Sequence, residues 1–216
     1  MNNGELNSNE NVSAVDVRKK RLAAIYDYVE IISVAIVAVL IIFSFIAQLS
    51  TVNGTSMAPT LAPGDRLVIS NLFYKPKTGD IVVFQQADGY FAEPLLKRVI
   101  ATEGQTVKID FEKWLVVVDG KPLNETYVLY DPGSSMDMED YYYTYRNYLD
   151  ENLTMTVPKG YVFVLGDNRN NSKDSRHPDI GLVDRREILG KAILLVLPGT
   201  DEGTRPREFG RIGAIK

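Results

Sequence analysis

Cysteine is absent from this chain of 216 residues, and histidine occurs once, as His177. The lack of cysteine excludes disulfide bonds, a cysteine nucleophile and zinc sites built on thiolates. One histidine excludes metal sites that need several, and it leaves a triad of serine, histidine and acid with a single possible base. Basic side chains number 24 against 28 acidic ones, for a net charge of −4. This balance argues against nonspecific nucleic-acid binding, which needs clustered positive charge.

Charge is missing altogether from one segment near the N-terminus, between Glu30 and Asp65. Within it, Ile31 to Leu49 are mostly aliphatic or aromatic. As a helix this run is roughly 28 Å long, close to the hydrocarbon thickness of a bilayer of about 30 Å. The sequence therefore predicts one transmembrane helix, with bounds at residues 28–50.

The apolar segment has two alternative interpretations besides an uncut membrane anchor. A buried core helix needs a polar face, which Ser33, Ser44 and Gln48 do not make. A cleaved secretory signal needs small residues one and three positions before the cut. For a cut after Ala47, the earlier of these positions is the large Phe45. An anchor is therefore favoured.

The basic cluster Arg18-Lys19-Lys20-Arg21 precedes this segment, and positive flanks stay in the cytoplasm. We therefore expect a cytoplasmic tail at residues 1–27 and an extracytoplasmic domain at 51–216 in a single-pass protein of the cell membrane. The first sixteen or so residues are rich in Asn, Glu and Ser without apolar periodicity, which is typical of disorder.

After the anchor, short β-branched runs alternate with Gly, Pro and Asp, and Asp119-Gly120 is a good hairpin turn. No long amphipathic helix is predicted, so the fold class is mainly β: an antiparallel sandwich or partly closed barrel. The expected strands are Arg66–Ser70, Asp80–Gln85, Leu95–Ala101, Thr106–Asp110, Trp114–Val118, Tyr161–Leu165 and Ala192–Leu197.

A tyrosine-rich stretch from Tyr127 to Tyr148 resists this assignment, and Pro132-Gly133 interrupts it. The favoured interpretation is a long surface excursion whose aromatic rings cover the sheet. A role in contacting substrate or membrane is the alternative.

Three polar segments contain residues that could take part in catalysis or bind a metal ion. The first is Asn53-Gly54-Thr55-Ser56-Met57-Ala58-Pro59-Thr60-Leu61, where Ser56 taken alone is most simply a turn residue. The third is Gly166-Asp167-Asn168-Arg169-Asn170-Asn171-Ser172-Lys173-Asp174-Ser175-Arg176, directly after an apolar strand. This loop lacks the ligand spacing of a calcium site, so no metal is predicted.

The second segment places two adjacent charges, Lys97 and Arg98, inside an apolar strand. Alternation puts them on opposite faces, each beside aliphatic neighbours. An edge strand with both charged heads reaching water is one interpretation. The other is burial, in which an arginine keeps its charge beside a carboxylate while a lysine tends to lose its proton and can then act as a general base.

Together and in this order, the three segments resemble the type I signal peptidases, membrane-anchored serine proteases with a serine-lysine dyad. Ser-Met-x-Pro-Thr-Leu matches the nucleophile motif, Gly64-Asp65 the motif that helps line the substrate groove, and Lys97-Arg98-Val99-Ile100-Ala101 the lysine motif. The resemblance implies a nucleophile at Ser56 and a general base at Lys97. Ser172 would then hydrogen-bond the lysine, and Asp174 would pair with Arg176 and with Arg98.

The resemblance also places Gly54, Met57 and Pro59 on the substrate and oxyanion side of the site. Some members carry a serine at the position of Gly54 whose hydroxyl helps bind the oxyanion, so this chain resembles the form common in Gram-positive bacteria. The oxyanion hole would rest on backbone N–H groups, including that of Ser56, with the second donor open. His177 is expected to be a loop residue.

The family resemblance implies an endopeptidase that removes signal peptides from exported preproteins after small-x-small sequences. Its partners would be preproteins and the lipid bilayer, close to the export translocon, with no cofactor and no nucleic acid. Two other classes of protein are alternatives. An inactive β-rich scaffold is disfavoured because Ser56 and Lys97 are both present, and a self-cleaving repressor because the chain has an anchor and no DNA-binding segment.

Overall fold

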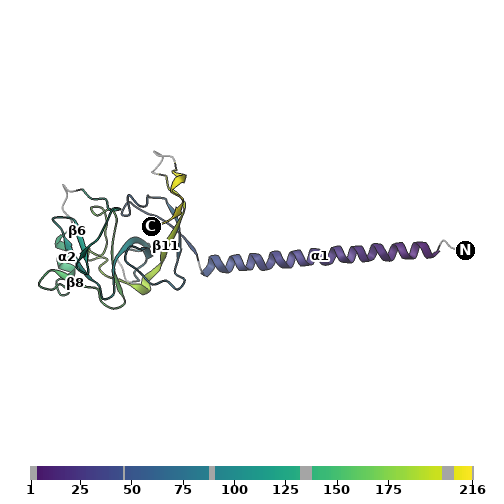
Figure 1. Ribbon diagram of the computed structural model, residues 1–216, viewed down its shortest axis with the longest axis horizontal. Helices are drawn as coiled ribbons and strands as arrows, with labels where there is room; N and C mark the ends of the chain where they lie inside the picture. Colours follow the sequence, from purple (N-terminus) through teal and green to yellow (C-terminus); the bar gives the residue numbers. More distant parts are fainter. Residues whose placement is uncertain (1–3, 46, 88–90, 132–137, 201–206, 216) are drawn as a thin grey trace. The chain divides into compact units, whose positions relative to one another are not determined.

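The computed structural model describes residues 4–45, 47–87, 91–131, 138–200 and 207–215. It divides into two units, residues 1–46 and 47–216. The first contains one uninterrupted helix, α1 (Gly4–Phe45; Figure 1). The expectation of a disordered tail is therefore not met from Gly4 onward, since no proline interrupts the chain there and its Glu, Leu and Ala residues favour helix.

Within α1, Arg18–Ile41 is long and apolar enough to cross a membrane. The hydroxyl of Ser33 donates to the carbonyl of Glu30 at 2.8 Å, so this polar group is satisfied within the helix itself. The predicted anchor at 28–50 extends too far, however. The helix ends at Phe45, and Gln48–Thr51 forms strand β1 instead; residue 46 lies outside the described residues.

The second unit is mainly β, as predicted, with two antiparallel sheets. The larger sheet has the order β1-β2-β11-β3-β4-β9-β10, with β12 paired to β11. Its strands are β2 (Arg66–Ser70), β3 (Ile81–Phe84), β4 (Leu95–Thr102), β9 (Tyr161–Leu165), β10 (Val183–Asp184), β11 (Ile188–Leu197) and β12 (Gly213–Ala214). This curled sheet carries the polar segments singled out above.

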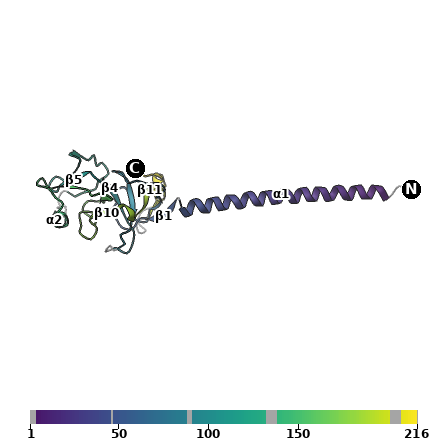
Figure 2. The same cartoon turned by 90° about the horizontal axis from the view of Figure 1, so that it is seen from below.

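The smaller sheet has the order β7-β6-β5-β8. Its strands are β5 (Thr106–Asp110), β6 (Leu115–Val118), β7 (Lys121–Pro122) and β8 (Thr154–Thr156). Asp119 and Gly120 both adopt positive φ between β6 and β7, which confirms the predicted hairpin turn. In two perpendicular views this sheet and helix α2 lie at the end of the unit away from β1 and β11 (Figures 1 and 2).

Helix α2 (Met138–Tyr145) was not predicted and forms part of the tyrosine-rich stretch. Tyr141 and Tyr145 are buried, and both rings contact Phe163 of β9. The prediction that aromatic rings of this stretch cover the sheet is therefore confirmed for these two tyrosines. The predicted break at residues 132–133 lies outside the described residues.

Candidate active site

The segment that carries Ser56 is a closed loop between β1 and β2. The N–H of Val52 donates to the carbonyl of Asp65, and the N–H of Gly64 donates to the carbonyl of Val52, so the two ends of the loop meet. Met57 and Leu61 are almost fully buried in the core formed with β2, β3 and β11. Because its neighbour Met57 is held in the core, half-buried Ser56 has a fixed position.

Lys97 approaches Ser56 from β4. Its Nζ donates to Ser56 Oγ at 2.8 Å and to the carbonyl of Leu96 at 3.1 Å. The residue is 3% exposed. Burial lowers the pKa of Lys97 to about 8; Arg176 lowers it as well, while Asp174 and Asp167 act in the opposite direction. A substantial fraction of this amine is therefore neutral at mildly alkaline pH.

The neighbouring Arg98 points to the other face of β4 and keeps its charge. Its Nε and Nη2 donate to the two carboxylate oxygens of Asp167 at 2.8 and 2.7 Å. Its Nη1 donates to the carbonyl of Gly79 at 2.8 Å, and its guanidinium lies 3.9 Å from the ring centre of Tyr127. Since β4 lies between β3 and β9, the alternative of an edge strand with both charges in water is wrong.

Asp174 forms a separate buried pair, with Arg176. Nε and Nη2 of Arg176 each donate to it at 2.8 Å, and so does the N–H of Gly166, at 3.0 Å. Burial opposes its ionisation, but Arg176 and Gly166 outweigh burial, and the pKa of Asp174 is lowered. The expected pairing of Asp174 with Arg98 is not formed, because Arg98 faces Leu165 across the sheet and therefore reaches Asp167.

Ser172 is placed differently from expectation. Its Oγ is buried, and no hydrogen bond to Lys97 is present among the described residues; Ser172 instead contributes to the lowered pKa of Asp174. Gly54 has φ +80°, in the region that favours glycine, two residues before Ser56. Pro59 follows a cis peptide bond in the same loop.

The loop after β9 contacts the Ser56 segment at several points that sequence reasoning missed. The N–H of Asn168 donates to the carbonyl of Ser56 at 3.0 Å, and Thr60 Oγ1 donates to Asp167 at 2.5 Å. Gly166 fits where no side chain could: a Cβ there would lie 2.2 Å from Ser172 Oγ and 2.6 Å from the carbonyl oxygen of Ser56. The sequence motifs did not indicate these contacts, because such contacts depend on tertiary proximity.

A cleft of about 300 Å³ opens over the Ser56 and Lys97 pair. One wall comes from β1 and the chain after it, including Ser50 and Asn53, and the other from Val83 of β3 and the start of β4. Among the described residues, no group of three His, Asp or Glu side chains could hold a metal ion. The contact of 2.8 Å between Lys97 Nζ and Ser56 Oγ is suited to nucleophilic attack by a serine with an amine as base.

A protein-family model described as signal peptidase, peptidase S26, matches residues 25–197. The chain belongs to the signal peptidase family. It is 35% identical over 188 residues to the probable signal peptidase I-1 of Synechocystis, covering 83% of this chain and 86% of that one. It is 32% identical to signal peptidase I P of Bacillus subtilis subsp. natto, covering 85% and 95%. These relationships identify a serine endopeptidase with signal peptidase I activity.

Among solved structures, the crystal structure of a signal peptidase I from Enterococcus faecalis is similar, with 30% sequence identity and a TM-score of 0.40. The match covers 55% of this chain and 97% of that one.

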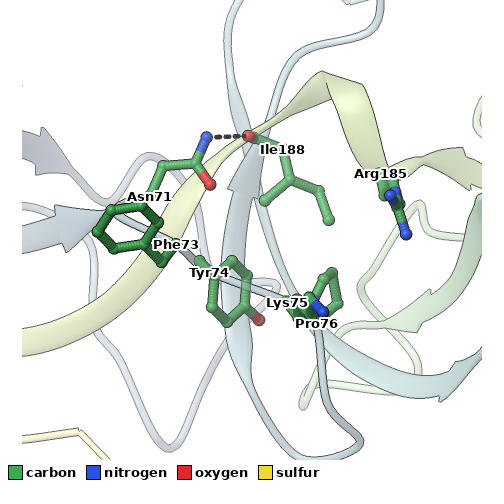
Figure 3. A pocket seen from close by; sticks show the side chains of 7 residues that line it. All are labelled: Asn71, Phe73, Tyr74, Lys75, Pro76, Arg185 and Ile188. Carbon is green, nitrogen blue, oxygen red and sulfur yellow. Dashed lines mark hydrogen bonds between the residues drawn. The ribbon is translucent and has the colours of Figure 1, made fainter.

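This signal peptidase has another hollow, of about 270 Å³, whose lining residues are drawn in Figure 3. It is lined by the connection between β2 and β3, with Phe73 and Tyr74, and by Arg185 and Ile188; Asn71 Nδ2 donates to the carbonyl of Ile188 at 3.3 Å. Neither Ser56 nor Lys97 lines it.

His177 lies in a loop, as expected, where its Nε2 is 3.2 Å from Asp140.

Proposed function

We propose that this signal peptidase cleaves preproteins with Ser56 as the nucleophile and Lys97 as the general base. The contact of 2.8 Å between Lys97 Nζ and Ser56 Oγ carries the proposal. The two carboxylates that raise the pKa of Lys97, Asp167 and Asp174, are engaged by Arg98 and Arg176. Burial therefore dominates the pKa of Lys97, which is about 8. An amine of this kind is matched to the abstraction of a proton near neutral pH.

In the first half of the reaction, neutral Lys97 accepts the proton of Ser56 as Oγ attacks the scissile carbonyl carbon. The N–H of Ser56 donates to the oxyanion; Gly54 has no hydroxyl to help. The tetrahedral intermediate collapses, the C–N bond breaks, and the Lys97 ammonium protonates the departing amine. An ester between Ser56 and the signal peptide remains.

In the second half, Lys97 is neutral again and takes a proton from water as that water attacks the ester carbonyl. The C–O bond to Ser56 breaks, and the proton returns to Oγ. The products are the signal peptide with a new carboxylate and the mature protein with a new amino group. No cofactor enters either half, and the protonation state of one amine controls both.

The cleft suits a substrate in extended conformation. β1 is the terminal strand of the larger sheet, so it offers an edge along which a substrate strand can pair. Val83, Leu95 and Leu96 give the cleft an apolar wall, and the whole cleft measures about 300 Å³. We infer that this wall accepts small side chains, in the small-x-small pattern before the cut.

We place the enzyme in the cell membrane with α1 as a single anchor. The apolar span within Arg18–Ile41 supports this, and the basic residues at positions 18–21 favour a cytoplasmic N-terminus. The catalytic domain then lies outside the cytoplasm, near the translocon from which preproteins emerge. Signal peptides in the bilayer would reach the cleft there.

Purified full-length enzyme in detergent, incubated with a preprotein, tests the dyad. Ser56→Ala and Lys97→Ala should each lower kcat/KM by at least about a thousandfold, as expected for loss of a nucleophile or its base. In the parent, kcat/KM should rise about tenfold per pH unit up to about pH 8 and then level off, because only neutral Lys97 is active.

The matched control is Lys121→Ala, which removes an exposed lysine in β7 and should cleave at the parental rate. Cleavage at the parental rate by Lys97→Ala, or a pH profile that is flat from pH 5 to 8, would contradict the proposal.

A further inference from the structure

The cleft carries a charge that the dyad chemistry does not use. Among the described residues that line it, Glu93 and Lys97 alone have ionisable side chains. Lys97 is neutral in the state that attacks, so Glu93 then supplies the single formal charge of the described cleft lining. The aliphatic residues beside it, Val83, Leu95 and Leu96, do not neutralise that charge.

Glu93 lies on the exposed rim of the cleft, in the connection that leads into β4. Its Oε2 accepts a hydrogen bond from Asn53 Nδ2 at 3.1 Å, and Asn53 belongs to the opposite wall. This bond orients the carboxylate across the mouth of the cleft. Because Asn53 is neutral, the bond leaves the negative charge in place.

Basic side chains near the cleft are engaged with other carboxylates. Arg98 and Arg176 pair with Asp167 and Asp174 below the dyad. Lys173 lies 5.8 Å from the ring centre of Phe91, beside the cleft, but its Nζ pairs with Asp179 at 3.2 Å. No lysine or arginine among the described residues forms a salt bridge with Glu93. The Glu93 carboxylate is therefore available to a cation on the substrate.

The alternation of an extended chain decides which substrate residue meets Glu93. Side chains one and three residues before the cut share one face, and the residue between them points the other way. With the two small residues against the apolar wall, the middle side chain is directed to the open rim. A lysine or arginine there has the length and the charge to reach Glu93.

We propose that Glu93 selects preproteins with a basic residue at the middle position of small-x-small and disfavours those with an acidic one. This inference rests on the proposed function. An exposed ion pair changes affinity by about twofold to fivefold, and an exposed like-charge contact opposes binding by a similar factor. The ratio of kcat/KM for a middle lysine against a middle glutamate should therefore be roughly tenfold in low salt.

The experiment uses the full-length enzyme in detergent and three preproteins that differ only in a middle Lys, Gln or Glu. The parent should prefer Lys over Glu by roughly tenfold at 20 mM salt and by less than about twofold at 1 M, where charges are screened within about 3 Å. Glu93→Gln should bring the ratio close to one, and Glu93→Lys should invert it. A merely structural role for Glu93 would change all three substrates alike.

Glu112→Lys is the matched control, since it makes the same change of charge on an exposed turn between β5 and β6. It should retain the parental ratio. A parental ratio near one, or a ratio that Glu93→Lys does not alter, overturns the inference while the dyad stands. Failure of the parent to cleave even the Gln preprotein would instead contradict the proposed function.

Discussion

Two adjacent residues of β4 show how differently one strand can bury positive charge. On one face, Arg98 donates to both oxygens of Asp167 and to the carbonyl of Gly79. On the other, Lys97 contacts a serine hydroxyl and a carbonyl oxygen and has no carboxylate of the described residues within ion-pair distance. Both side chains are at most 3% exposed.

The difference lies in the partner rather than in the depth of burial. A guanidinium stays charged because a carboxylate is placed to receive it, whereas an amine without one gives up its proton more readily. The two buried ion pairs affect Lys97 indirectly. They engage Asp167 and Asp174 with arginines, and these carboxylates raise the pKa of Lys97 by less than burial lowers it.

Lys97→Arg should have the largest effect, because it places a guanidinium on both faces of β4. A guanidinium does not lose its proton in a protein, so the variant keeps the charge and loses the base. We expect kcat/KM on a preprotein to fall by about a thousandfold or more at every pH between 6 and 10. Recovery of activity at high pH would show that the base is another group.

Asp167→Ala acts on the opposite face and leaves Arg98 buried without its carboxylate. Removing one partner of a buried pair costs about 3–5 kcal/mol, which should appear as a loss of that size in the free energy of unfolding. The control is Lys113→Ala, which breaks an exposed pair with Asp110 and should cost less than about 1 kcal/mol. Equal losses in the two variants would mean that the Arg98 pair contributes no more than a surface contact.

Lys97→Met should have the smallest effect, and it measures how much the buried lysine lowers the free energy of unfolding. The pKa of Lys97 is about 8 in the folded chain and about 10.4 in the unfolded chain. Below pH 8 both states hold the proton, so the folded state carries the full penalty. Between pH 8 and about 10.4 the folded state has lost it first, and stability rises with pH.

The methionine variant lacks this penalty and should be more stable than the parent at pH 7, by roughly 2 kcal/mol after loss of the contact to Ser56. The difference should shrink as the pH approaches 10. Thermal unfolding of the full-length chain in detergent at pH 7 and 10 measures it. A parent that is more stable than the variant at pH 7 would show that burial of the charged lysine does not destabilise the fold.

Much of the fold follows from local sequence. Arg66–Ser70, Thr106–Asp110 and Tyr161–Leu165 form strands with the predicted bounds, because β-branched runs between turn residues determine them locally. The proximity of Ser56 and Lys97 was expected only through the family resemblance. Nothing in the spacing of two residues on separate elements determines a distance between them.

Other features could not be predicted because they depend on tertiary contacts. β1 is uncharged, like the apolar helical segment that precedes it, and its pairing with β2 makes it a strand. α2 gains its stability from two tyrosines packed on β9. The partner of Arg98 depends on the register of β4 against β9, in which Arg98 lies opposite Leu165.

The position of β1 has a consequence for where cleavage can occur. Eleven residues lead from Phe45, the end of α1, to Ser56, so a fully extended chain would place Ser56 no farther than roughly 40 Å from that end. Four of these residues are fixed in the sheet by β2, and the remainder are few. If α1 is anchored in a bilayer as proposed, this short connection keeps Ser56 close to the membrane surface. The proposal then predicts that bonds emerging close to the lipid are cut, whereas identical sequences deep in an exported domain are out of reach.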